Sequence, residues 1–229
     1  MPLRAVPLVN NEVYHIYNRS ITSTPTFTCK RDYQRALNIL NYYQYANTPD
    51  SYSKLKRYSL KEKSDLFNRL KKENKVLIKI ISFCLMPNHF HFLLQQQKEE
   101  GISKCVGNFQ NSYTRFFNLK NKRLGPLFQG AFKAVRIETD EQFLHVSRYI
   151  HLNPYSSLIV KSFKDVAKYP WSSLKEYLNP NKETISSPKS VISHFESSQA
   201  YLKFVLDQAK YQKSLEEIKH LILEKVNRT

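Results

Sequence analysis

The sequence predicts an α+β fold: a ferredoxin-like (split β-α-β) antiparallel sheet with helices on one face, plus a helical C-terminal extension. The predicted elements follow the order strand, helix, strand, strand, helix, strand, which is the order of the split β-α-β arrangement. With 229 residues, 41% of them hydrophobic, the chain can bury a full core. Beyond Asn179 the chain changes to segments bearing Ser, Pro and Asn, followed by helical patterns.

The N-terminal third contains the first strand and two helices. Residues 11–20 alternate and are rich in β-forming side chains, which predicts a strand. Residues 30–46 carry apolar side chains at helical spacing, which predicts the first helix. A polar loop follows. Ser59 and Glu62 then form a capping-box pattern, which predicts the start of a short basic helix that ends near Glu73.

The middle of the chain contains the hairpin of the sheet. Residues 75–86 and 89–97 are two apolar runs separated by the turn signal Pro87-Asn88, so they predict two paired strands. Residues 101–120 predict the next helix, and residues 125–137 predict a fourth strand between loops.

A further helix and the extension complete the predicted order. Thr139 and Gln142 form a second capping-box pattern, and Pro154 is predicted to end the helix that begins there. We place a boundary near Asn179, which divides the chain into a domain at 1–178 and a helical extension at 179–229. Residues 201–211 and 214–226 predict the helices of that extension.

The charge of the chain is its strongest compositional signal. Lys and Arg number 36 against 19 Asp and Glu, a net charge of +17. Residues 54–79 hold ten basic and three acidic side chains, and residues 98–136 hold eight basic and two acidic ones. Basic residues alternate with aromatic ones in the second stretch, a mixture suited to a phosphate backbone with unstacked bases. A solvated basic surface is the simpler alternative.

The cysteines and the termini indicate the compartment. The three cysteines are an odd number without paired spacing, which argues against a disulfide framework and against a zinc knuckle. No apolar run approaches the length of a membrane helix, and the N-terminus lacks a signal-peptide core. We therefore expect a soluble protein of the reducing cytoplasm, without a membrane partner.

His89 and His91 stand out in the second strand of the hairpin, "HFHFLLQQQ". Side chains alternate along a strand, so these two imidazoles share one face. Two imidazoles on one face can share a metal ion, although such a pair is more often structural or half-exposed. The strand by itself leaves both interpretations open.

The helix that begins at Thr139 carries candidate partners for the two histidines. Tyr149 and Asn153 are four residues apart and share a helical face, and His145 lies one turn before Tyr149. If this helix crosses the sheet face that bears the histidines, an amide oxygen would complete a metal site beside a phenol. A metal ion there would stabilise charge developing on a phosphoryl group. His145 is a possible site-orienting residue.

These residues carry a resemblance to a known family. "MPNHFHFLL" resembles the HUH motif (His, bulky apolar residue, His), and "YIHLNP" resembles the tyrosine helix of single-tyrosine HUH transposases. This family comprises the IS200-like and REP-associated tyrosine transposases of bacteria. The similarity runs from "YHIYNRS", which begins at Tyr14, through "GPLFQGAFK" to "YPWSSLKEYL". The family often has Arg after "FQG", where this chain has Ala131.

The resemblance implies an activity and a set of roles. It implies cleavage and rejoining of single-stranded DNA at a hairpin-flanked site through a 5′-phosphotyrosine, as in DNA transposition or REP-element processing. It implies that Tyr149 is the nucleophile and that His89, His91 and Asn153 bind Mg²⁺ or Mn²⁺. We expect the protein to be a monomer or homodimer. The residues that we expect to bind DNA are Arg19, Arg115, Asn118, Lys120, Lys122, Arg123, Lys133 and Arg136.

Other functional classes fit the sequence less well. A histidine-triad nucleotide hydrolase would need a third alternating histidine, but position 93 is Leu93. A replication initiator or relaxase would share the chemistry, but these proteins usually carry the tyrosine in another context or add a helicase domain. A catalytically silent, domesticated DNA- or RNA-binding protein would keep the basic surface without needing the tyrosine. If the change Tyr149→Phe leaves every activity of the protein unchanged, that alternative is favoured.

Overall fold

The computed structural model describes residues 7–73, 75–179 and 184–209. The chain divides into two compact units. The first comprises Met1–Ile80 and Pro87–Ile137, and the second comprises Ile81–Met86 and Glu138–Thr229. Because this division does not follow the order of the sequence, the boundary predicted near Asn179 stays a prediction.

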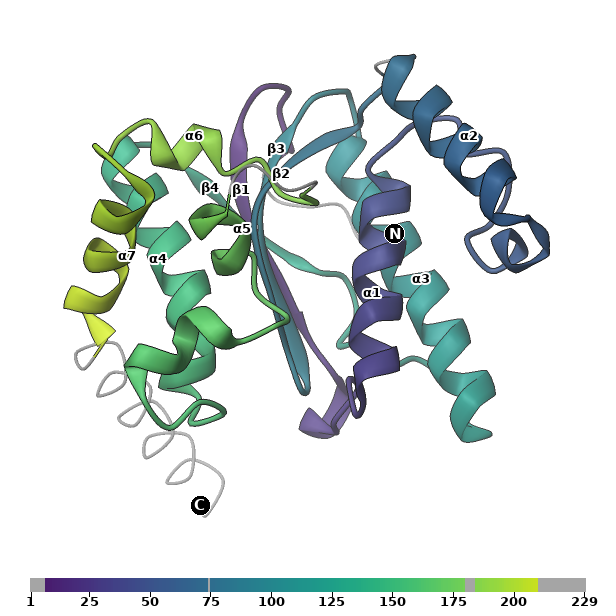
Figure 1. Ribbon diagram of the computed structural model, residues 1–229. Coiled ribbons are helices and arrows are strands. Elements are labelled where there is room, and N and C mark those ends of the chain that lie inside the picture. Colours follow the sequence, from purple (N-terminus) through teal and green to yellow (C-terminus); the bar gives the residue numbers. More distant parts are fainter. Residues whose placement is uncertain (1–6, 74, 180–183, 210–229) are drawn as a thin grey trace. The chain divides into compact units, whose positions relative to one another are not determined.

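Four strands form one antiparallel sheet, and this confirms the predicted α+β fold. The strands are β1 (Val13–Arg19), β2 (Ile78–Met86), β3 (His89–Gln96) and β4 (Lys133–Ile137). Their spatial order is β2-β3-β1-β4 (Figure 1), the order of the split β-α-β arrangement. β1 lies between β3 and β4 and is antiparallel to both.

The first unit buries one face of its strands beneath two helices. α1 (Lys30–Tyr43) and α3 (Gly101–Asn121) pack against each other on the same side of the sheet (Figure 1). Phe90 and Phe92 of β3 meet Phe109 of α3 edge-on, with ring centroids 5.2 and 5.3 Å apart. All three side chains are fully buried. Side chains alternate along β3, so His89 and His91 lie on the face opposite to this aromatic core.

An ion pair ties the end of α3 to the start of α1. Lys120 Nζ lies 2.6 and 2.8 Å from the two carboxylate oxygens of Asp32, whose side chain is buried. Burial opposes ionisation of Asp32, but hydrogen bonds from Lys120 and Thr28 outweigh it and lower the pKa of the carboxyl group. Lys120 therefore holds two helices together.

The basic helix α2 (Leu60–Lys72) begins as predicted. Ser59 accepts a hydrogen bond from the Glu62 backbone N–H, and the Glu62 carboxylate accepts one from the Ser59 backbone N–H. This reciprocal pair satisfies two backbone donors that the helix itself leaves without partners. The predicted capping box is thus confirmed.

The fourth strand is shorter than predicted. Residues 125–132 form a loop before β4, with one isolated bridge between Ser20 and Phe128. Gly125 and Gly130 have φ of 87° and 56°, values in the left-handed region that interrupt an extended strand. The prediction of a strand over 125–137 was therefore wrong for its first eight residues.

The second unit is mainly helical. It holds α4 (Asp140–Ser156), the 3₁₀ helix Phe163–Lys168, and the short helices α5 (Leu174–Leu178), α6 (Lys189–Ile192) and α7 (Ser198–Asp207). α7 accounts for part of the helix predicted at 201–211, and the one predicted at 214–226 lies outside the described residues. None of the described helices combines the length and the apolar character needed to cross a bilayer.

The ends of α4 correct two details of the prediction. The helix does not stop at Pro154 but continues to Ser156, because the Ser157 N–H still bonds to the Asn153 carbonyl at 3.0 Å. At the other end Thr139 accepts from the Gln142 N–H. The Gln142 side chain, however, accepts from the backbone N–H of Glu138, so the second capping box is only half formed.

Candidate active site and nucleic-acid interface

Histidines from two strands meet on the face of the first unit that lies opposite the aromatic core. Register pairs Arg19 with His89 and Tyr17 with His91, and directly opposed residues of paired strands share a face. His15 lies diagonally across from His91, and its Nε2 is 3.0 Å from the Nδ1 of His91. The rings of His89 and His91 are 5.1 Å apart. The predicted pair is therefore part of a cluster of three imidazoles.

The three rings of the cluster differ in exposure, and burial shifts the pKa of His15. His91 is buried and His89 is half-buried. Burial lowers the pKa of His15 to about 4, so this imidazole is neutral at neutral pH. Neutral imidazole is the form that binds a metal ion.

A metal ion held by His89 and His91 needs ligands of another type. Within the described ranges, no three His, Cys, Asp or Glu side chains gather as a potential metal site. Divalent ions such as Mg²⁺ and Mn²⁺ accept amide oxygens, phosphate oxygens and water as well. Two imidazoles with an amide oxygen and substrate oxygens form a chemically suitable donor set. The donor chemistry of the predicted ligands suits such an ion, and their role as ligands stays a prediction.

Tyr149 and Asn153 lie on α4, in the second unit. Tyr149 is half-buried and Asn153 is buried, and their spacing of four residues places both on one side of the helix. Tyr149 therefore belongs to a helix rather than to a loop.

A buried polar network holds the opposite side of α4. The Ser147 hydroxyl lies 3.2 Å from that of Ser82 in β2 and 2.7 Å from that of Tyr201 in α7. The two ring nitrogens of His151 lie 2.7 Å from the Tyr201 hydroxyl and 2.8 Å from the Ser173 hydroxyl. Ser147 and His151 are four residues apart and share the side of the helix that faces away from Tyr149. The network thus sets the rotation of α4.

This network makes the stability of the protein dependent on pH. Burial lowers the pKa of His151 to about 3. The same ring titrates near pH ~6.5 in an unfolded chain, so the unfolded state binds more protons between those values, and the free energy of unfolding falls as pH falls. We expect a loss on the order of 2 kcal/mol from His151 between about pH 7 and about pH 5.

Denaturant titrations in the presence of chelator measure this loss. His151→Gln keeps a donor and an acceptor for Ser173 and Tyr201 but does not titrate, so its stability should fall less between the two pH values. His145→Gln, a change at an exposed histidine of the same helix, is the matched control. An equal fall in the His151→Gln and wild-type proteins would contradict this assignment.

His145 is placed on the surface of the second unit. Its side chain is 52% exposed and lies 4.0 Å from the Glu141 carboxylate. Its ring also approaches Arg148 at 3.5 Å and Phe204 at 6.2 Å between centroids. These contacts belong to the surface of α4 and α7, and they give no support to the orienting role predicted for His145.

The predicted DNA-binding residues fall into three groups. Arg19 and Lys133 lie on the histidine face, since register places Arg19 opposite His89 and Lys133 opposite Tyr17. Lys120 and Arg136 form ion pairs, Lys120 with buried Asp32 and Arg136 with Glu12 at 2.9 Å. The remaining residues surround a pocket at the end of α3. The first group thus lies on the histidine face and the third lines a pocket, whereas the charges of the second group are paired with carboxylates.

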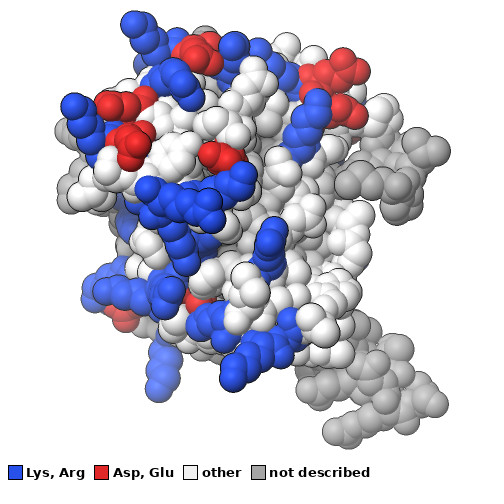
Figure 2. Space-filling model, turned by 90° about the vertical axis from the view of Figure 1, so that its right-hand side faces the viewer, with Lys and Arg blue, Asp and Glu red and all other residues white. Residues whose placement is uncertain are grey.

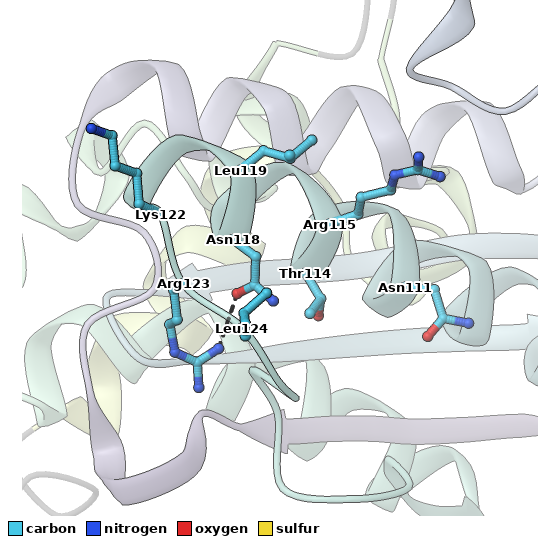
Figure 3. Close-up of a pocket in the computed structure, with 8 residues that line it drawn as sticks. All are labelled: Asn111, Thr114, Arg115, Asn118, Leu119, Lys122, Arg123 and Leu124. Carbon is cyan, nitrogen blue, oxygen red and sulfur yellow. Dashed lines mark hydrogen bonds between the residues drawn. The ribbon is translucent and has the colours of Figure 1, made fainter.

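The pocket at the end of α3 has a volume of about 690 Å³ (Figure 3). Its lining includes Arg115, Asn118, Leu119, Lys122, Arg123 and Leu124. Arg123 is held in place, because it donates to the Asn118 side chain at 3.0 Å and to the Pro126 carbonyl at 2.6 Å. Leu119 and Leu124 are 76% and 93% exposed.

The charge on one face of the molecule is mainly positive. Lys and Arg cover more of the face in Figure 2 than Asp and Glu do.

One residue of the site, His15, was not predicted from the sequence. The alternation of "VYHIYNR" places His15 on one face of β1, but its contact with His91 depends on the pairing of β1 with β3. Motif matching cannot supply that register. Alternation combined with the predicted strand order was the only signal available.

Comparison with known proteins gives a consistent result. Residues 48–153 match the family model described as "Transposase IS200 like". This segment contains His89, His91 and Tyr149 and ends at Asn153. A solved REP-associated tyrosine transposase bound to a REP hairpin is similar in fold, with a TM-score of 0.52 and 14% identity over 83% of this chain and 93% of that one. No curated protein matches the sequence.

Proposed function

Residues 48–153 match the model of the IS200-like transposases, and we propose that the chain is a transposase of this kind that cleaves and rejoins single-stranded DNA through Tyr149. The observation that carries the proposal is the histidine cluster, in which His89 and His91 share one sheet face with Arg19 and Lys133. Two imidazoles beside two cations suit a phosphodiester, whose charge increases in the transition state.

The chemistry is a transesterification in two steps. The Tyr149 oxygen attacks phosphorus and forms a phosphotyrosine bond, while the bond to the 3′ oxygen breaks and that oxygen takes up a proton. In the reverse sense, a 3′-hydroxyl attacks the phosphotyrosine and Tyr149 leaves with the proton. No net oxidation occurs, and the energy of the cleaved bond is kept in the covalent link for rejoining.

The residues of the chain divide this work. Tyr149 supplies the nucleophile, and the buried network behind α4 limits its motion. His89, His91 and Asn153 would hold Mg²⁺ or Mn²⁺, which supplies Lewis-acid polarisation of a phosphoryl oxygen and favours the phenolate. Arg19 and Lys133 would bind the phosphate oxygens beside the cleaved bond.

The pocket at the end of α3 would bind a part of the DNA other than the phosphate that is cleaved. Arg115, Lys122 and Arg123 present positive charge, and Leu119 and Leu124 present apolar surface to unpaired bases. A hairpin-flanked single strand offers both phosphates and unstacked bases. The fold similarity to a transposase bound to a REP hairpin is in line with such a substrate.

Salt dependence of DNA binding tests this surface. We expect affinity for a single-stranded oligonucleotide to fall steeply with salt, because each neutralised phosphate releases a counterion. Changing Arg115 and Lys122 to Gln should flatten the plot of log affinity against log salt by about 0.7 for each phosphate that is no longer neutralised. Fluorescence anisotropy over a salt series measures the slope.

The control for this titration is Lys104→Gln on the same helix, where the lysine pairs with Glu100 at 3.0 Å. This variant should keep the wild-type slope. Lys120 is unsuitable for the experiment, because its removal leaves Asp32 buried without its cation. A slope unchanged in the Arg115 and Lys122 variant would exclude the pocket as a DNA contact.

The direct test of the function is cleavage of a panel of single-stranded hairpin oligonucleotides with Mg²⁺ or Mn²⁺. Nicked products that remain attached to protein under denaturing conditions are the expected result. Binding without cleavage across the panel would favour the alternative, a catalytically silent DNA- or RNA-binding protein.

A further inference from the structure

Both candidate metal-binding histidines are held at the same ring nitrogen. His91 Nδ1 lies 3.0 Å from the Nε2 of His15, and His89 Nδ1 lies 2.6 Å from the Oδ1 of Asn88. We propose that His15 and Asn88 are positioning residues that keep the proton of each histidine on Nδ1 and so present Nε2 to a divalent metal ion. This inference rests on the metal role proposed for His89 and His91.

The contact of Asn88 with His89 determines a tautomer. The Asn88 amide nitrogen donates to the Ser23 carbonyl at 3.1 Å, which orients the amide and turns its oxygen toward His89. A carboxamide oxygen can only accept a hydrogen bond. The Nδ1 of His89 must therefore be the donor, and in a neutral ring the remaining lone pair is then on Nε2.

In the hydrogen bond between His15 and His91, one of the two ring nitrogens must donate and the other must accept. If His91 binds metal through Nε2, its Nδ1 carries the proton and donates to the Nε2 of His15. The Nε2 of His15 lies 3.0 Å from this Nδ1, within hydrogen-bond distance, and can accept through its lone pair. The acceptor role places the proton of His15 on its own Nδ1.

Ring packing restricts the orientation of His91 as well. The rings of His15 and Tyr17 both lie beside that of His91, with centroids 5.2 and 5.8 Å from it. β1 thus supplies two rings and one hydrogen bond to a single ligand on β3. Partners of this kind set the tautomer and direction of metal-binding histidines, and their loss typically weakens metal affinity about 10–100-fold.

Two variants of His15 separate positioning from packing. His15→Phe keeps an aromatic ring on β1 but removes the acceptor, whereas His15→Gln supplies an amide oxygen as a replacement acceptor. We expect His15→Phe to weaken Mn²⁺ binding about 10–100-fold in isothermal titration calorimetry, and His15→Gln to recover much of that loss. Asn88→Asp keeps an acceptor and should bind Mn²⁺ at least as tightly as the wild type, whereas Asn88→Leu should weaken binding.

The tautomers can be measured without metal. ¹⁵N NMR of the metal-free protein near neutral pH should show His89 and His91 protonated at Nδ1, and His15→Phe should shift the population of His91 toward the other tautomer. His89 or His91 protonated at Nε2 in the wild type, or unchanged Mn²⁺ affinity in His15→Phe, would overturn the inference. If the wild type binds no Mn²⁺, the proposed metal role fails, while the NMR result still decides which nitrogen is protonated.

Discussion

Tyr149→Phe is expected to abolish cleavage, formation of the covalent adduct and rejoining of strands together. The change removes the oxygen that forms the bond to phosphorus, and each activity needs that bond. It removes almost no packing area, so the protein should fold and bind DNA as the wild type does. Denaturing gels measure cleavage and rejoining, and anisotropy measures DNA affinity.

Tyr155→Phe is the matched control for this experiment. Tyr155 lies on the same helix, is buried, and meets the ring of Phe163 at 6.2 Å. Its change should spare the chemistry. Tyr113→Phe is less suitable, because the Tyr113 hydroxyl donates to the Thr26 carbonyl at 2.7 Å in the core. Its loss should cost about 1 kcal/mol of stability. Cleavage by the Tyr149→Phe protein at the wild-type rate would show that the nucleophile is elsewhere.

His91→Ala is expected to remove metal-dependent cleavage. It deletes one of two imidazole ligands, so the loss of Mn²⁺ affinity should exceed the roughly 10–100-fold that loss of an outer partner causes. Chelator should stop the wild-type reaction, and added Mn²⁺ should restore it at lower concentration than Mg²⁺, because imidazole suits Mn²⁺ better than Mg²⁺. Calorimetry and cleavage assays measure both effects.

Gln95→Ala provides the control on the same strand. Gln95 shares the face of β3 with His91 and donates to the Asn11 carbonyl at 2.9 Å, outside the histidine cluster. This variant should keep metal binding and cleavage. A wild-type reaction that proceeds undiminished in excess chelator would refute a metal requirement.

Local patterns predicted those parts of the fold that local interactions determine. Ser59 and Glu62 form their capping box within four residues, and alternation in β3 separates Phe90 from His91. The helix through Pro154 was predicted to stop too early, because the absence of one N–H does not by itself end a helix. Leu152 and Tyr155 on either side are buried, and this packing supports a further half turn.

Contacts between distant segments were beyond the reach of such patterns. The charge of Lys120 counts toward a basic cluster in the sequence, but the structure pairs it with buried Asp32, eighty-eight residues away in the chain. The partnership of His15 with His91 likewise depends on strand register. A family motif points to the candidate catalytic and metal-binding residues. The side chains that hold those residues in position, such as His15, are found only from the tertiary structure.

The most direct test of the role of Tyr149 is mass spectrometry of the trapped DNA–peptide adduct. The wild-type protein is incubated with a hairpin-flanked oligonucleotide and divalent metal ion, and the covalent product is digested with protease and nuclease. We predict a nucleotide linked by a phosphodiester to the peptide that contains Tyr149. An adduct on any other tyrosine, or cleavage without an adduct, would contradict this role.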